Sequence, residues 1–124
     1  MVYPVGMTQP TQRELVAQYF NGFRTSDHHA VLVTLTDDVE WVIHGARTTR
    51  GKAEFDTEIE NPGFSGSPTL DIRRTYEDGS VVIVVGEGRG TSVKEGPFRF
   101  AFTDLFTFRG NLIARIDSYL VALP

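Results

Sequence analysis

The sequence predicts a single α+β domain in which about three N-terminal helices pack on one face of a curved, mixed and mostly antiparallel sheet. Two observations support this fold class. Apolar residues recur at helical spacing in the first part of the chain, and later they alternate along extended runs rich in Val, Ile, Phe and Thr. Helices followed by an antiparallel meander are typical of α+β proteins, and 124 residues suffice for one domain with its own core.

The helices are expected early in the chain. The first begins with a Thr-x-x-Glu capping box formed by Thr11 and Glu14, and its apolar residues share one face. A second helix is expected to start at Asp27 and to carry Ala30, Val31, Leu32 and Leu35. A third, weaker helix covers "GKAEFDTEIENPG" and ends at the final Asn-Pro-Gly of that stretch.

The strands follow. The stretch "DDVEWVIHG" predicts the first one, and two hairpins come later. In the first hairpin Asp78-Gly79 lies between two alternating runs, and in the second Arg109-Gly110 does so. Because no repeat or linker interrupts the chain, we interpret residues 1–124 as one domain, with residues 1–10 as a loose N-terminal segment.

Composition excludes several classes of function. The net charge is −4 and no Lys/Arg cluster exceeds a pair, so we expect no nucleic-acid partner. No apolar run is long enough to span a bilayer, and no leader pattern opens the chain, so we expect a cytoplasmic protein without a membrane partner. The chain has no cysteine, and its three histidines lack ligand spacing, so we expect neither a metal nor another cofactor.

An acidic residue interrupts the most aromatic strand. Asp104 shares one predicted strand face with five phenylalanines: Phe98, Phe100, Phe102, Phe106 and Phe108. An ionised carboxylate in apolar surroundings must find a partner, change its pKa or face a wet cavity. If Arg109-Gly110 is the hairpin loop, Asp104 lies opposite Arg115, with Asp117 diagonal to it. A tight preceding hairpin would bring Glu87 and Arg89 to the same face.

These residues are the candidate site. The candidate catalytic residues are Asp104, Asp117 and Arg115. The candidate substrate-binding residues are Tyr19, Trp41, His44, Glu87, Arg89, Phe100, Phe102, Phe106 and Tyr119. Three alternatives stay open: the Asp104–Arg115 pair is catalytic or structural, Tyr19 supplies a pocket hydroxyl or packs in the core, and His44 lies at a pocket rim or in a loop.

The stretches "ELVAQYFNGFRTSD", "LTDDVEWVIHG", "GKAEF" and "DLFTFRGNLIARIDSYLV", in this order, resemble the nuclear transport factor 2-like superfamily. That superfamily includes SnoaL-type polyketide cyclases, ketosteroid isomerases and limonene epoxide hydrolases. The resemblance implies a cone-shaped half-barrel around an apolar pocket, a small apolar molecule as partner, and a homodimer. We expect the dimer to form through the open face of the sheet, where these apolar residues alternate away from the pocket: Ala101, Leu105, Leu112, Ala114, Ile116 and Leu120. One fold carries many activities, so the site must decide the function.

The resemblance also suggests residue roles. The last-strand Asp of the epoxide hydrolases falls at Asp117 and their other carboxylate near Glu87, whereas their Arg position holds Val85, so Arg89 or Arg115 would have to substitute. The isomerase base falls at or near Ile43, which cannot take a proton. The acid/base Asp of SnoaL-type cyclases has its nearest counterpart in Asp104.

Two classes of function remain. One is a cofactor-free cyclase, isomerase, lyase or hydrolase that performs general acid/base chemistry on a hydrophobic substrate. The other is a non-catalytic ligand-binding or accessory domain with the same pocket. A carboxylate that points into a pocket with room for a substrate would favour the enzyme.

Overall fold

The computed structural model describes residues 9–124. The elements in chain order are α1 (Gln12–Thr25), α2 (His28–Leu32), β1 (Leu35–Ile43), β2 (Arg47–Arg50), α3 (Gly51–Ile59), β3 (Thr69–Asp78), β4 (Val81–Ser92), β5 (Gly96–Arg109) and β6 (Leu112–Leu123). The expected loose segment, residues 1–10, falls almost wholly outside the described residues.

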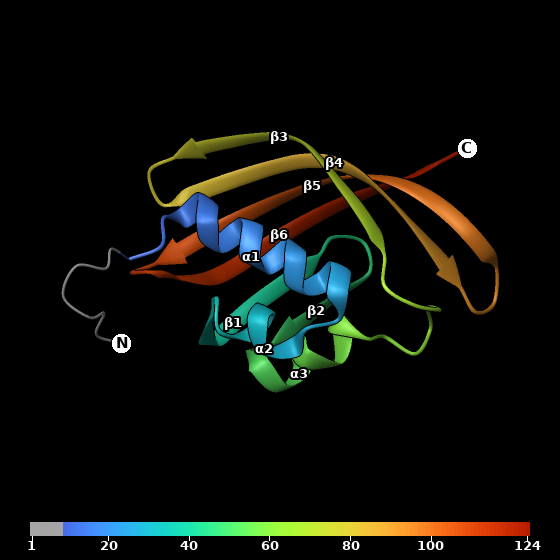
Figure 1. The fold of residues 1–124 in the computed structure, drawn as a ribbon, viewed down its shortest axis with the longest axis horizontal. Coiled ribbons are helices and arrows are strands. Elements are labelled where there is room, and N and C mark those ends of the chain that lie inside the picture. The colour runs from blue at the N-terminus through green and yellow to red at the C-terminus, as the bar shows by residue number, and fades with distance from the viewer. Residues whose placement is uncertain (1–8) are drawn as a thin grey trace.

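All six strands form one sheet in the order β2-β1-β6-β5-β4-β3. The β1–β6 pair is parallel and every other pair is antiparallel. The long strands curve around α1, and α2 and α3 lie beside β1 and β2 (Figure 1). The predicted α+β half-barrel with a mixed, mostly antiparallel sheet is therefore confirmed.

Helix α1 forms because its start is capped and one of its faces is apolar. The Thr11 hydroxyl accepts the Glu14 backbone N–H at 3.1 Å, and the Glu14 carboxylate accepts the Thr11 N–H at 3.0 Å, which is the predicted capping box. The buried face of the helix consists of Leu15, Val16, Tyr19, Phe20 and Phe23. These side chains pack with the sheet residues in one core, so the helix covers the concave face of the sheet.

Both hairpin turns lie one residue later than predicted. The loops are residues 79–80 and 110–111, because Asp78 pairs with Val81 and Arg109 pairs with Leu112. Glycine takes the first loop position in each, with φ of 57° at Gly79 and 63° at Gly110. A positive φ at that position is easy only for glycine, so the glycines set the turns.

Strand β6 contains a bulge that the sequence analysis did not foresee. Phe108 pairs with Ile113, but the next residue, Thr107, pairs with Arg115, so Ala114 is the extra residue. Beyond the bulge, Asp104 lies opposite Ser118. The predicted pairing of Asp104 with Arg115 is therefore wrong, because the extra residue moves the later side chains of β6 to the other face.

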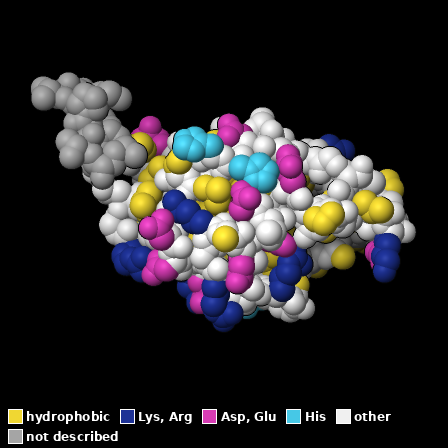
Figure 2. Space-filling view, turned by 90° about the horizontal axis from the view of Figure 1, so that it is seen from below, with side chains coloured by type: hydrophobic (Ala, Val, Ile, Leu, Met, Phe, Trp, Pro, Cys, Tyr) yellow, Lys and Arg dark blue, Asp and Glu magenta, His cyan; other side chains and the backbone are white. Residues whose placement is uncertain are grey.

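Two further observations concern possible partners. Within residues 9–124, no helix is long and apolar enough to cross a membrane. On the face of the molecule in Figure 2, basic and acidic side chains are interspersed. The expected cytoplasmic location and the expected lack of a nucleic-acid partner stay predictions.

Candidate functional site

A cavity of about 430 Å³ lies between the helices and the concave face of the sheet. Its lining is largely apolar and includes the aromatic side chains of Tyr19, Phe20, Phe23, Trp41, Phe64, Phe98, Phe100 and Phe102. The cavity suits an apolar ligand of small-molecule size.

Glycines on β4 make room for the phenylalanine row on β5. Gly88 lies directly opposite Phe100, and Gly90 directly opposite Phe98. A Cβ at Gly90 would lie 2.8 Å from Cζ of Phe98, and a Cβ at Gly88 would collide with the ring of Phe100. The rings therefore lie over the β4 backbone, and in this position they line the cavity.

Asp104 lies in this cavity wall with only 8% of its surface exposed. Burial raises the pKa of its carboxyl to about 7, although hydrogen bonding by Ser118 opposes the rise. Tyr19 from α1 lines the same cavity, and burial together with the charge on Asp104 raises the pKa of its phenol well above 10. The Tyr19 hydroxyl is therefore neutral, and Asp104 changes its charge near neutral pH.

Ser118 is held in one orientation. The Trp41 indole N–H donates to the Ser118 hydroxyl oxygen at 2.8 Å. Because an indole is only a donor, the serine oxygen must accept there, which leaves the serine O–H to donate elsewhere. Asp104 lies directly across from Ser118 on the neighbouring strand. Ser118 could not be predicted as a site residue from the sequence, because its position opposite Asp104 depends on the bulge in β6.

A second polar group, the rim cluster, consists of Arg47 of β2, Glu58 of α3 and Asn61, all of which line the cavity. The Arg47 Nε lies 3.0 Å from both Glu58 oxygens, Nη2 also donates to Glu58, and the Asn61 amide donates at 3.1 Å. The Glu58 side chain is only 8% exposed, whereas that of Arg47 is 46% exposed. Only the i, i+3 spacing of Glu58 and Asn61 at a helix end hinted at this cluster in the sequence.

Arg115 and Asp117 lie on the opposite, open face of the sheet. Arg115 donates to both Asp117 oxygens at 2.9 Å and to Glu40 at 2.6 Å. Hydrogen bonds from Arg115, with a smaller contribution from His44, hold the pKa of the Asp117 carboxyl below its usual range. The placement of Arg115 and Asp117 in the pocket, predicted from the wrong register, is therefore wrong.

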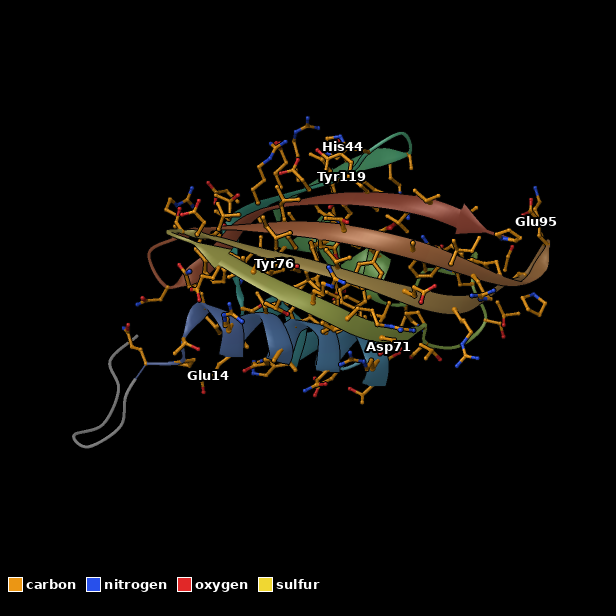
Figure 3. The ribbon with its side chains drawn as sticks, turned by 90° about the horizontal axis from the view of Figure 1, so that it is seen from above. Glu14, His44, Asp71, Tyr76, Glu95 and Tyr119 are labelled. Carbon is orange, nitrogen blue, oxygen red and sulfur yellow. The ribbon has the colours of Figure 1, made fainter. Side chains whose placement is uncertain are left out.

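His44 and Tyr119 belong to the same open-face network. The His44 Nε2 lies 2.9 Å from Asp117, and its ring stacks on that of Tyr119 with centroids 4.3 Å apart. Figure 3 shows both side chains together on the side of the sheet away from α1. His44 also contributes to the cavity lining at the end of β1. Tyr119 does not, so its expected place in the pocket is wrong.

Three other predicted pocket residues also lie elsewhere. Val84, not Glu87, lies opposite Asp104, so Glu87 and Arg89 are on the open face. There Glu87 pairs with Arg73 at 2.9 Å. Phe106 is on the predicted face but fully buried under α1, where its ring packs on Tyr19 at 5.1 Å. Of the candidates, the cavity lining contains Tyr19, Trp41, His44, Phe100, Phe102 and Asp104.

The residue roles suggested for an epoxide hydrolase do not fit this geometry. Both proposed carboxylates, Glu87 and Asp117, face away from the cavity. Ile43 does line the cavity, but its side chain cannot carry a proton. Among the described residues, the carboxylates in the cavity lining are Asp104 and Glu58.

Solved structures with the same fold include an NTF2-like protein of unknown function from Burkholderia pseudomallei, with a TM-score of 0.79 and 19% identity over 88% of this chain and 89% of that one. A hypothetical protein with a ketosteroid isomerase-like fold from Catenulispora acidiphila, in complex with trimethylamine, has a TM-score of 0.77 and 19% identity over 90% of this chain and 86% of that one. An LEH-like epoxide hydrolase from M. tuberculosis has a TM-score of 0.74 and 18% identity over 86% of this chain and 80% of that one. At these identities the likeness shows the fold alone.

No curated protein sequence matches the chain. The model of the SnoaL-like domain family matches residues 16–116, which extend from the apolar face of α1 into β6 and include Trp41 and Asp104. By this match the chain belongs to the SnoaL-like domain family.

Proposed function

We propose that the protein is a small-molecule enzyme in which Asp104 carries a proton to or from an apolar substrate, without a cofactor. One observation supports this most: Asp104 is nearly buried in the wall of a cavity with room for a substrate. The influences on its pKa include no cation from the described residues. A structural carboxylate would be expected to have such a partner.

The surroundings of Asp104 suit acid/base chemistry. A carboxyl whose pKa is about 7 exists in both protonation states near neutral pH, so it both donates and accepts a proton there. The neutral Tyr19 hydroxyl and the oriented Ser118 hydroxyl belong to residues that line the same cavity and supply further hydrogen-bond donors. A substrate carbonyl placed against Asp104 would accept its proton as negative charge develops on the oxygen.

Proton exchange tests this proposal without a known substrate. The protein is incubated with 2-tetralone in D₂O, and deuterium incorporation next to the carbonyl is followed by NMR; opening of styrene oxide is measured in parallel. We expect the wild type to exchange the substrate faster than buffer alone, with a rate that changes near pH 7. In Asp104→Asn the exchange rate should fall by about 100-fold or more. Asp71→Asn, an exposed carboxylate on β3, is the control.

The alternative is a ligand-binding or accessory domain that uses the same cavity. It predicts that 2-tetralone binds but exchanges no faster than in buffer, in the wild type and Asp104→Asn alike. Equal exchange rates in these two proteins would remove the role proposed for Asp104.

The homodimer implied by the family resemblance stays a prediction. It is predicted to form through the open face of the sheet, where Ala101 and Leu105 lie between the charged networks. Two side chains expected there, Ile116 and Leu120, are on the cavity side instead, because the bulge in β6 reverses them. A second copy would thus meet a mixed apolar and ionic surface.

A further inference from the structure

The rim cluster contains an arginine that is oriented but not fully used. Arg47 donates to Glu58 through Nε and Nη2. Within residues 9–124, its Nη1 has no acceptor. A guanidinium carries five N–H donors in a planar fork, so Arg47 still presents donors after its pairing with Glu58.

Arg115, on the open face, shows what such an arginine does with a second acceptor. It binds Asp117 through Nε and Nη2, as Arg47 binds Glu58, and it also binds the Glu40 carboxylate through Nη1 at 2.6 Å. One arginine thus bridges two carboxylates. In Arg47, which lines the cavity, the pairing with Glu58 leaves the equivalent nitrogen without an acceptor among the described residues.

We propose that Arg47, oriented by Glu58, binds the carboxylate of an apolar acid whose hydrocarbon part fills the aromatic cavity. The aromatic walls favour a hydrocarbon body through burial of apolar surface. Arg47 neutralises Glu58, so the rim does not repel an acid, and arginine binds carboxylates in a charge-assisted, directional way.

The same cavity excludes the reverse orientation. Asp104 lies deep in the wall, and a second carboxylate beside it would have no cation from the described residues to compensate either charge. The acid group therefore lies at the rim and the apolar end lies toward Asp104. The proposal rests on the proposed function only for the reaction at Asp104, because binding is measurable without turnover.

The test compares cyclohexanebutanoate with its alcohol, 4-cyclohexylbutan-1-ol, which has the same hydrocarbon part and no charge. Both are transparent where tryptophan emits, and Trp41 is the one tryptophan of the chain and lies in the cavity wall, so its fluorescence reports binding. We expect the wild type to bind the acid at least tenfold more tightly than the alcohol at pH 7.5. Calorimetry gives an independent dissociation constant.

The decisive variant is Arg47→Met, which keeps an unbranched, largely apolar side chain and removes the charge and the N–H donors. We expect it to weaken acid binding at least tenfold and to leave alcohol binding within twofold, which also shows that the cavity is still formed. Arg47→Lys keeps the charge and should weaken acid binding less. The control is Arg50→Met on the same strand, where the arginine is 71% exposed and pairs with Glu40.

Equal wild-type affinity for acid and alcohol, no binding of either, or an acid preference that survives in Arg47→Met would each overturn the proposal. Asp104→Asn separates it from the proposed function, since this variant should lose proton exchange and still prefer the acid. If the acid preference is lost in Asp104→Asn and kept in Arg47→Met, Arg47 is not the residue that binds the carboxylate.

Discussion

Two aspartates lie on neighbouring strands of the same sheet, one on each face. Asp104 of β5 faces the cavity, where aromatic rings and two hydroxyl-bearing side chains surround it, and its pKa rises to about 7. Asp117 of β6 faces outward, where Arg115 and His44 bind it, and its pKa falls. The comparison teaches that the sheet face, rather than the residue type, decides whether the pKa of a carboxyl is raised by burial or lowered by charged partners.

The largest expected effect is on the pH dependence of stability. The pKa of Asp104 is raised from 3.8 to about 7, so its contribution to folding is fully present below pH 4 and is lost as the pH rises toward 7. This loss amounts to roughly 4 kcal/mol in the free energy of unfolding. Asparagine at position 104 cannot ionise. In urea unfolding from pH 4 to 8, the free energy of unfolding of Asp104→Asn should therefore rise relative to that of the wild type by about that amount.

Asp117→Asn is the matched variant on the other face and should show the opposite sign. Because the pKa of Asp117 is lower in the folded protein than in the unfolded chain, its carboxylate stabilises the fold at pH values above the unfolded pKa. This stabilisation is lost as the pH falls through the folded pKa. The substitution should therefore cost most at neutral pH and least in acid, once the Asp117 carboxyl is protonated in the folded protein. If both variants followed the wild type in parallel, the contrast between the two faces would be lost.

The next largest effect is on stability, and it compares two neighbouring residues of β4: Gly88 on the cavity face and Glu87 on the open face. In Gly88→Ala the new methyl group meets the Phe100 ring, so we expect a loss of about 1–3 kcal/mol and weaker ligand binding as the ring moves into the cavity. Glu87→Ala removes exposed ion pairs on the open face and should cost less than about 1 kcal/mol. Chemical denaturation measures both, and equal costs would contradict the close fit of Phe100 over Gly88.

The smallest effect is a change in the pKa of Asp104 itself. Ser118→Ala removes a hydrogen bond that lowers this pKa, so the carboxyl should titrate still higher in a carbon-detected NMR titration. Ser118→Thr keeps the hydroxyl and should restore the wild-type value. The Asp117 carboxyl is the internal control, and a pKa of Asp104 that stays fixed in Ser118→Ala would show that Ser118 does not bind it.

The local elements could be predicted because their signals are local. The capping box of α1 and its apolar face are complete within a few residues of sequence, and the structure confirms both. The second helix came out shorter than expected, because Leu35, counted on its apolar face, begins β1 instead. The third helix ends at Ile59, before the Asn-Pro-Gly that was expected to stop it.

The site was harder to predict because it depends on register. Moving the second turn by one residue changes each pairing partner by two positions, which leaves every side chain of β6 on its predicted face. The extra residue at Ala114 then changes the partner by one and reverses the faces. Nothing in the alternation of Leu112 to Tyr119 marks this bulge, so Asp104 was correctly placed among phenylalanines while its partner was not.

The parallel pairing of β1 with β6 has a consequence for how the chain folds. The Trp41–Ser118 hydrogen bond joins residues 77 positions apart, so this pairing requires closure of a long loop. The hairpins of β3 to β6 involve neighbours in sequence and can form first, whereas β1, with β2 and α3 attached, has its place only once β6 is in the sheet. Such non-local contacts slow folding. We therefore expect docking of β1 on β6 to be a late step, and until it occurs the cavity has neither its Trp41 wall nor its rim.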